Sequence, residues 1–204
     1  MRSHFKIPVN AIGVGRRVFI RRPGEKDEAE FMSNLKHSRD FLYPWIINRT
    51  SVSFYKSYLL RFEKRDIGYF VCLKKNGKIA GVININEVEK GDDDKATLGF
   101  YSFLPYARQG YLSEGLNLVL EEAFNHLGFR CLEANIQSEN QASINFVQKH
   151  GFRQENFLPR SLLVSGKWLD HDRWALHRDV WLENRNKKDN EKNTYQCLSD
   201  RRTG

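Results

Sequence analysis

The sequence predicts one domain of the α+β (α/β) class, and three observations predict it. A length of 204 residues suits one medium-sized domain, and a hydrophobic content of 40% is enough to form a core. An Asn-Gly pair at 76–77 joins two strand-like runs, which is the strongest short signal for a β-hairpin. A long amphipathic helical pattern directly follows a strand-like run that ends at a proline. The resulting element order is β-α-α-β-β-β-α-β-α-β-β, with no internal repeat.

Composition divides the chain into three parts. Residues 1–16 are basic and have no regular pattern. Residues 17–182 carry all the predicted strands and helices and form the expected domain. Residues 183–204 are polar, and we expect them to be a disordered tail because they bury too little apolar surface to fold.

The first elements are one strand and two helices. Val18 and Ile20 alternate with polar neighbours, as in a strand. Residues 24–42 have a helical pattern with acidic side chains in the first turn, where the helix dipole favours them. Pro44 interrupts this pattern, and apolar residues at helical spacing predict a second helix over 51–66.

The later elements alternate between strands and helices. A hairpin is predicted over 68–88 and a further strand over 96–104. The amphipathic helix is predicted over 113–127. A strand then precedes a short helix within 140–152, and two final strands are predicted over 161–181.

The net charge is +8 and the pI is near 9.4, which favours an anionic partner such as a phosphorylated cofactor, an acidic substrate or nucleic acid. The alternative is a solvated surface with basic ends, because much of the charge is terminal. Neither reading needs a membrane, since no apolar run approaches the roughly 20 residues of a transmembrane helix.

Cysteine usage indicates a reducing compartment. Cys72, Cys131 and Cys197 are odd in number and far apart, and the first two lie in apolar runs. No pair of Cys or His residues has the spacing of a metal site, so no metal is expected. The N-terminus lacks the apolar core of a signal peptide, and we therefore expect a cytoplasmic protein.

The junction between strand 96–104 and the amphipathic helix predicts an anion site. Unpaired N–H groups at a helix start attract phosphate, and Gly110 lets it approach closely because it has no side chain. Arg108 adds charge and Ser113 adds a hydroxyl group. Pro105 cannot extend the sheet, so the neighbouring strand is expected to part from this one and open a slot. The alternative is an ordinary glycine turn.

A second motif makes the family resemblance clear. The stretch "ANIQSENQASINFVQKHGFRQE" contains a strand, then Asn140 and Ser143 in an N-x-x-S pattern, then a short helix that closes with Gly151-Phe152. With "YARQGYLSEGL", "FLYPWI" and "GKWLDHDRWAL", it resembles the GNAT superfamily of acyl-CoA-dependent N-acetyltransferases. The closest resemblance is to the RimJ/RimL-type ribosomal-protein N-terminal acetyltransferases. It covers roughly residues 17–182.

The resemblance implies a mixed, mostly antiparallel central sheet that is splayed in the middle and flanked by helices. Acetyl-CoA would be the co-substrate and would lie in the splay. The backbone of Phe103 and Leu104 would pair with the pantetheine arm, and Asn140 would also bind it. The diphosphate would be wrapped by the loop and helix start: Arg108, Gln109, Gly110, Tyr111, Leu112 and Ser113.

Two positions depart from the family pattern of this loop. Ala107 stands where the family usually has Arg or Gln, and Leu112 stands where it usually has Gly or Ala. Leu112 is therefore expected to crowd the helix start. Val147 stands where many relatives carry a tyrosine acid, and the resemblance implies that Ser143 replaces it near the thiol.

Acetyl transfer to an amine needs a proton acceptor for the amine and a proton donor for the departing thiolate. An α-amine has a pKa near 8, so a weak base or a water chain suffices, and direct attack without an acyl-enzyme is expected. Glu87, at the end of a hairpin strand, is the first candidate for the base. Asn135 is a candidate for holding a water, and Glu133 is the third choice; exposed or structural roles are the alternative for each.

Three functions remain open on the sequence alone. The first is acetylation of a protein N-terminus, with a ribosomal protein suggested by the resemblance. The second is acetylation of a small amine such as a polyamine or an aminoglycoside. The third is a non-catalytic acyl-CoA-binding module that contacts the ribosome through the basic ends. Both a monomer and a homodimer are compatible with the sequence.

Overall fold

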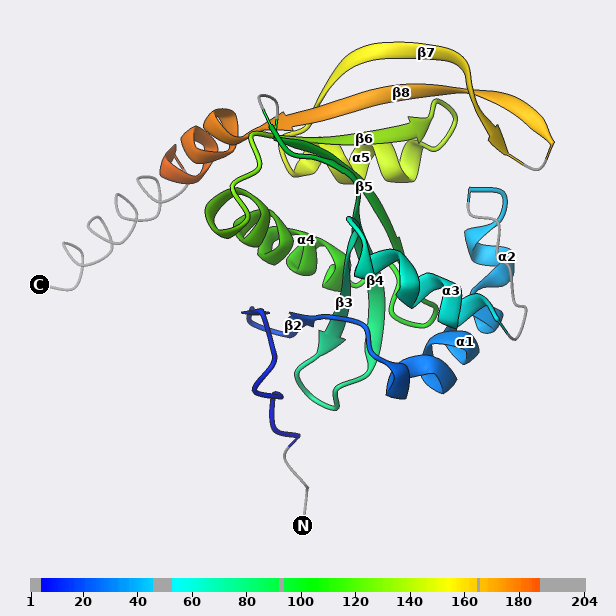
Figure 1. The fold of residues 1–204 in the computed structure, drawn as a ribbon, viewed down its shortest axis with the longest axis vertical. Coiled ribbons are helices and arrows are strands. Elements are labelled where there is room, and N and C mark those ends of the chain that lie inside the picture. The colour runs from blue at the N-terminus through cyan, green and yellow to red at the C-terminus, as the bar shows by residue number, and fades with distance from the viewer. Residues whose placement is uncertain (1–4, 46–52, 92–93, 165, 188–204) are drawn as a thin grey trace, which may run out of the picture.

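The computed structural model describes residues 5–45, 53–91, 94–164 and 166–187, and it confirms the α+β class (Figure 1). The strands form one eight-stranded sheet in the order β1-β2-β3-β4-β5-β6-β8-β7. Their bounds are β1 Gly13–Val14, β2 Val18–Arg21, β3 Ile67–Leu73, β4 Ile79–Glu89, β5 Lys95–Ser102, β6 Cys131–Gln137, β7 Arg153–Val164 and β8 Lys167–His177.

The helices confirm the predicted order between the strands. The α-helices are α1 Glu28–His37, α2 Arg39–Leu42, α3 Phe54–Leu60, α4 Tyr111–Glu121 and α5 Gln141–Lys149. Short helical turns are η1 Glu25–Asp27, η2 Arg61–Glu63 and the π-helical η3 Glu122–His126 that continues α4. None of the helices in the described part of the chain is long and apolar enough to cross a bilayer.

The sheet is splayed at its centre. Every neighbouring pair of strands is antiparallel except β5 and β6, which are parallel. Their ladder has three residue pairs and ends at Thr97 and Glu133, although β5 continues to Ser102 and β6 to Gln137. The two strands therefore diverge beyond this ladder, as Figure 1 shows, and the expected mixed, mostly antiparallel sheet is confirmed.

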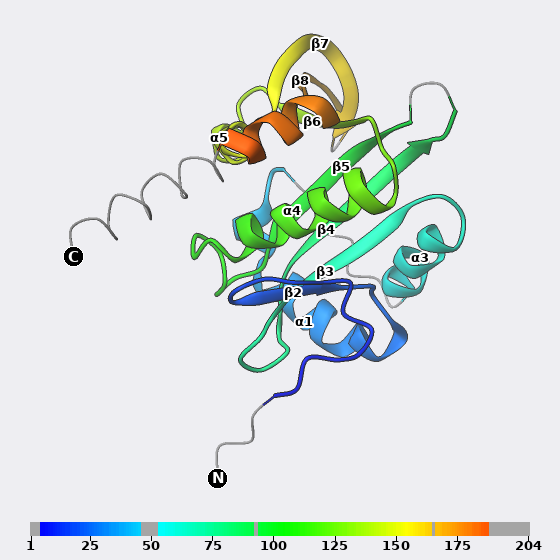
Figure 2. The same ribbon diagram turned by 90° about the vertical axis from the view of Figure 1, so that its left-hand side faces the viewer.

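Two apolar clusters cover the two faces of the sheet. On one face α4 and α5 pack on β2 to β6 through residues such as Leu116, Phe124 and Val147. On the other face α1 to α3 pack on β2 to β5 around Phe31, whose ring contacts Tyr55, Tyr58, Phe70 and Phe103. Figures 1 and 2 show α4 and α1 on opposite sides of strands β3 and β4.

Two glycines are required by this packing. Gly77 confirms the predicted hairpin turn: its φ is 73°, and an added Cβ would lie 2.4 Å from the Phe5 ring. Gly115 lets α4 approach β3, because an added Cβ would lie 2.5 Å from Val71. The amphipathic helix is thus held close against the strands that precede the splay.

The C-terminal end differs from the prediction. Residues 178–187 are helical, whereas the sequence pattern was interpreted as strand to residue 181 and as irregular tail from 183. The apolar Val180 and Trp181 sit on one helical turn, and the Trp181 ring packs 5.2 Å from Phe124 of η3. The rest of the predicted tail lies outside the described residues.

Candidate cofactor and acceptor site

The start of the loop between β5 and α4 is hydrogen-bonded to β4 and to the residue that ends α1. The Phe103 N–H donates to the Ala80 carbonyl at 2.9 Å, and the Leu104 N–H donates to the hydroxyl of the fully buried Ser38 at 2.9 Å. The Phe103 carbonyl in turn accepts from Tyr106 at 2.8 Å. These bonds fix the place where the chain leaves the sheet.

The predicted pairing of Phe103 and Leu104 with pantetheine is therefore constrained, because both N–H groups already have partners. Alternate residues of an antiparallel strand turn their backbone groups to opposite sides. Since Phe103 faces β4, Phe100 and Ser102 face the side on which β6 diverges. The strand edge open to a ligand in the splay is thus formed by Phe100 and Ser102, which precede the predicted pair Phe103 and Leu104.

The start of α4 has the backbone geometry expected of an anion site. Gly110 is the N-cap with φ 78°, and Arg108 is also left-handed with φ 60°. No side chain caps this helix start. The first N–H groups of an uncapped helix point outward and favour an anionic ligand.

Arg17, which the sequence analysis did not single out, lies against this helix start. Its Nε donates to Glu114 Oε2 at 3.0 Å, and its Nη1 donates to the Gln109 carbonyl at 3.0 Å. The guanidinium carbon is 4.7 Å from the centre of the Tyr111 ring. The backbone N–H groups of Arg17 and Val18 both donate to Glu114 Oε1.

These contacts keep Glu114 ionised. Burial opposes its ionisation, but hydrogen bonds from Arg17 and Val18 and the Arg17 charge outweigh burial, and the pKa of Glu114 is lowered. The carboxylate lies in the first turn of α4, where the helix dipole also favours a negative charge.

Leu112 does not crowd the helix start as the sequence suggested. Its side chain is turned toward β4, where Gly81 leaves room: an added Cβ on Gly81 would lie 2.9 Å from Leu112 Cδ1. Leu112 is partly buried against the core cluster below α4. The departure from the family pattern at 112 is accommodated by the absence of a side chain at 81.

The start of α5 flanks the other side of the splay. The predicted Asn140 is its N-cap, 8% exposed, and its Oδ1 accepts from the Ser143 N–H at 3.1 Å. No described residue bonds to the Asn140 Nδ2 or to the Ser143 hydroxyl, so both can act as donors. Across the splay, the Phe146 ring of α5 packs 4.8 Å from Phe100 of β5.

A histidine joins the two helices. His150, the C-cap of α5, bonds to the Ser113 hydroxyl through Nε2 at 2.9 Å and to Asn117 through Nδ1 at 3.0 Å. Ser113 was predicted to help wrap the diphosphate, and the structure places its hydroxyl in this bridge. The bridge ties the first turn of α4 to the end of α5.

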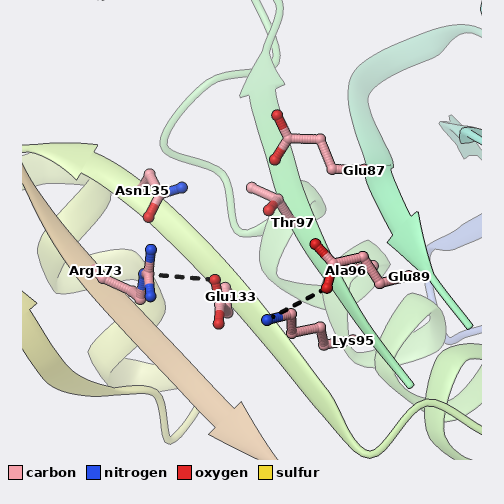
Figure 3. Close-up of a pocket in the computed structure, with 8 residues that line it drawn as sticks. All are labelled: Glu87, Glu89, Lys95, Ala96, Thr97, Glu133, Asn135 and Arg173. Atoms are coloured by element: carbon pink, nitrogen blue, oxygen red, sulfur yellow. Dashed lines mark ion pairs between the residues drawn. The ribbon is translucent and has the colours of Figure 1, made fainter. Parts of the chain in front are cut away.

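A separate pocket of about 150 Å³ opens on the sheet face away from α4, where β5 and β6 diverge (Figure 3). Three glutamates and two cations line it. Two ion pairs lie within it, Lys95 to Glu89 at 3.3 Å and Arg173 to Glu133 at 3.5 Å. The lining residues are Glu87, Glu89, Lys95, Ala96, Thr97, Glu133, Asn135 and Arg173.

Glu87 occupies a β-bulge in β4. Its φ is 51°, a left-handed conformation that is rare for a residue other than glycine, and the register between β4 and β5 shifts between Asn86 and Glu89. The Glu87 N–H donates to Asp66 Oδ1 at 3.1 Å, and Arg61 holds both Asp66 and Asn86. Bulges often redirect a side chain next to an active site, and this one turns Glu87 into the pocket.

Two buried polar atoms of this pocket lack hydrogen-bond partners among the described residues. They are Asn135 Oδ1 and Arg173 Nε, and within the described chain the latter has only its ion pair with Glu133 at 3.5 Å. Asn135 and Arg173 face each other across the β6–β8 ladder. Such atoms are uncommon in folded proteins and mark places where a water or a ligand completes the bonding.

The structure brings together the two candidate bases, Glu87 and Glu133, and the candidate water-binding residue Asn135, since all three line one pocket. Ser143 is not among the lining residues, and its role as a donor stays a prediction. The sequence analysis missed Arg173, which reaches the pocket because β8 pairs with β6 in a register that local patterns do not reveal. It also missed Arg17, whose contacts with Glu114 span 97 positions.

The two cysteines of the described chain have raised pKa values. Burial raises the pKa of Cys72 to about 12 and that of Cys131 to about 11. Their thiols are therefore protonated near neutral pH and react slowly.

Comparisons with known proteins match this geometry. The family model described as "Acetyltransferase (GNAT) domain" matches residues 17–153. The chain is 21% identical over 173 residues to the probable N-acetyltransferase YjcK of Bacillus subtilis, covering 79% of this chain and 94% of that protein.

Solved structures share the fold. The ribosomal-protein-S5-alanine acetyltransferase from Vibrio fischeri superposes with a TM-score of 0.73 at 20% identity, covering 82% of this chain and 97% of that one. RimJ of Mycobacterium smegmatis, solved in complex with CoA-disulfide, superposes with a TM-score of 0.72 at 24% identity, covering 82% and 83%. The chain belongs to the GNAT family of N-acetyltransferases, and acetyl-CoA is its co-substrate.

Proposed function

We propose that the acceptor is the N-terminal α-amine of a protein, with a ribosomal protein as the first candidate, and that the acetyl group passes to it directly. The observation that carries this proposal is the Glu87 pocket at the divergence of β5 and β6. It offers a carboxylate and an amide oxygen to an incoming amine at the point where the sheet opens. The names of the ribosomal-protein acetyltransferases that share the fold support the choice of a protein N-terminus.

On the acceptor side, Glu87 accepts the amine proton, either directly or through a water held by Asn135. An α-amine with a pKa near 8 is partly neutral at physiological pH, so a carboxylate base is sufficient. Arg173 keeps Glu133 in an ion pair, which leaves Glu87 as the lining glutamate without an ion pair among the described residues. The reaction needs no covalent enzyme intermediate, and the high thiol pKa values of Cys72 and Cys131 agree with that.

On the cofactor side, acetyl-CoA supplies the activated thioester. The N–H groups at the start of α4, with Arg108, Gln109, Gly110, Tyr111, Leu112 and Ser113 around them, bind the diphosphate. The edge of β5 at Phe100 and Ser102 and the Asn140 amide bind the pantetheine amides. The Ser143 hydroxyl donates a hydrogen bond to the sulfur of the departing thiolate.

A second acceptor class is favoured by one specific observation. Three glutamates line the pocket against two cations, which suits a small amine with more than one positive charge, such as a polyamine. A peptide N-terminus carries one amine and an adjacent carbonyl, and it can use both the orphaned Asn135 Oδ1 and the donors of Arg173. That match ranks the peptide first. A cytoplasmic location and contact with the ribosome are part of the same proposal.

The test is a CoA-release assay with acetyl-CoA and two matched acceptor panels. One panel contains peptides with free N-terminal Ala or Ser and the same peptides blocked at the N-terminus; the other contains spermidine and aminoglycosides. Turnover of the free peptides at least tenfold above that of the small amines supports the proposal. Faster turnover of the small amines assigns the pocket to the second class.

A further inference from the structure

We propose that Arg17 is a binding residue for the diphosphate of acetyl-CoA. Its Nε and Nη1 are bonded to Glu114 and to the Gln109 carbonyl, and its Nη2 donates a hydrogen bond to a phosphate oxygen. The inference rests on the proposed position of the diphosphate at the start of α4. It adds a cation from the segment before β2 to a site that the sequence placed entirely within 103–113.

The first support is the position of the guanidinium. A Cβ built on Gly110, the N-cap of α4, would lie 3.2 Å from Arg17 Nη2. The charged group is therefore directly beside the helix start, on the side toward which Gly110 has no side chain. Arg108, the cation that the sequence singled out, lies in the loop before α4 and is exposed, as Arg17 is.

The second support is the use of its donors. Nε is bonded to Glu114 and Nη1 to the Gln109 carbonyl, whereas no described residue bonds to Nη2. The Tyr111 ring supports the guanidinium plane from one face. A guanidinium held by two of its nitrogens presents the third in a fixed direction, as a phosphate-binding arginine requires.

The third support is how firmly Arg17 is held. Its backbone carbonyl accepts from Lys74 at 2.8 Å, and its backbone N–H donates to Glu114 at 2.6 Å. Gly15 makes room for this carboxylate, since an added Cβ would lie 2.7 Å from Glu114 Oε1. The residue is thus positioned before any ligand arrives, which lowers the entropy lost on binding.

Charge also matters at this position. Glu114 is ionised in the first turn of α4 and by itself would repel a phosphate. Arg17 neutralises it, so the helix start keeps its positive potential. Loss of Arg17 would remove a cation and leave the Glu114 carboxylate unpaired beside the diphosphate.

The experiment compares two thioesters that differ in the diphosphate. Arg17→Met keeps the aliphatic stem and removes the charge and donors. We expect its Kd for CoA, measured by calorimetry, to rise about 10- to 100-fold, the range of a charge-assisted hydrogen bond. Its kcat/KM should fall similarly with acetyl-CoA and by less than threefold with acetyl-pantetheine, which has no diphosphate. Arg17→Lys should recover part of the loss.

Two further variants distinguish an arginine that binds the diphosphate from one that only supports the loop before α4. Glu114→Gln keeps Arg17 and should change the Kd for CoA by less than fivefold. Arg22→Met is the matched control, because Arg22 also lies over a tyrosine ring, that of Tyr69 at 4.3 Å, and bonds to a backbone carbonyl at Gly68. We expect it to leave CoA binding unchanged.

Each outcome decides the proposal. Equal losses with the two thioesters, or a loss in Glu114→Gln as large as in Arg17→Met, would reduce Arg17 to a structural support and overturn it. An unchanged Kd in a folded Arg17→Met variant would overturn it as well. If the wild-type chain binds CoA but acetylates no peptide, the proposed acceptor is wrong while the role of Arg17 still stands.

Discussion

The two sides of the splay are built in contrasting ways. On the cofactor side, the loop before α4 is bonded to Ser38, Ala80 and Arg17, and Glu114 is bonded on both oxygens. On the acceptor side, the pocket contains a glutamate with a left-handed backbone and two buried polar atoms without hydrogen bonds to the described residues. The loop on the cofactor side is thus held by internal hydrogen bonds, whereas the acceptor pocket leaves buried polar atoms without them.

This difference indicates that the cofactor side binds the co-substrate common to the family, whereas the acceptor side determines which amine is recognised. A preformed anion site serves any member of a family that uses the same co-substrate, and its residues lie close together in the sequence. A pocket assembled from β4, β5, β6 and β8 changes with single substitutions on any of four strands.

The largest expected effect is on the cofactor side. Gly110→Glu places a side chain against Arg17 and a negative charge where phosphate is proposed to lie, and the Kd for CoA should rise more than 100-fold. Gly128→Glu is the matched control: Gly128 has a similar φ of 74°, but an added Cβ would have nothing within 4 Å. An equal loss in both variants would point to backbone strain instead of a diphosphate site.

On the acceptor side, Glu87→Gln should lower kcat about 100-fold, the typical contribution of a general base, and leave the Kd for CoA unchanged. The reason is that the amide keeps the shape of the pocket and loses the proton acceptor. Stopped-flow or steady-state rates with a free N-terminal peptide measure it. Glu63→Gln, on the exposed η2 turn, is the control. Wild-type rates in Glu87→Gln would move the base to Glu133 or to water.

Ser143 lies between the two sides and should show an intermediate effect. Ser143→Ala removes a hydroxyl that no described residue uses while keeping the N–H that Asn140 caps. We expect about a tenfold lower kcat with an unchanged Kd for CoA, consistent with a donor to the thiolate. Equal changes in both constants would make Ser143 a binding residue only.

The smallest effect concerns stability on the cofactor side. The pKa of Glu114 is lowered from a reference near 4.5, so its contribution is present above that pH and is lost as the pH falls through the lowered pKa. Glu114→Gln should therefore lower the Tm by about 2 °C at pH 7, since the pair is partly exposed. This difference should shrink as the pH falls below 4.5, through the lowered pKa of Glu114. A Tm difference that is constant with pH would mean that packing, not charge, holds the loop.

Local patterns predicted the turns around the site better than the contacts between its strands, for a physical reason. They identified the hairpin at Asn76-Gly77 and the helix that follows Gly110, because turns and helix starts depend on neighbouring residues. The sequence also points to Glu87 and Asn135, yet only the pairing of β4 and β6 with β5 brings them to one pocket. Arg17 and Arg173 were missed because only the register of distant strands places them.

Some predictions were wrong because residues distant in the sequence determine the local structure. Leu112 was expected to crowd the helix start, but Gly81, on a different strand, makes room for it. Residues 178–187 were interpreted partly as strand and partly as tail, but contact with Phe124 favours a helix. In each case the deciding residue lies more than 30 positions away in the sequence.

The three-pair ladder between β5 and β6 has one further consequence. It is the only place within the described sheet where the first five strands join the last three, and the Phe100 and Ser102 amides beyond it face a gap. A pantetheine chain lying there would act as a temporary strand that bonds to these amides. Occupancy should then be visible as slowed deuterium uptake at Phe100 and Ser102, while the amides of β3 exchange at the same rate with and without CoA.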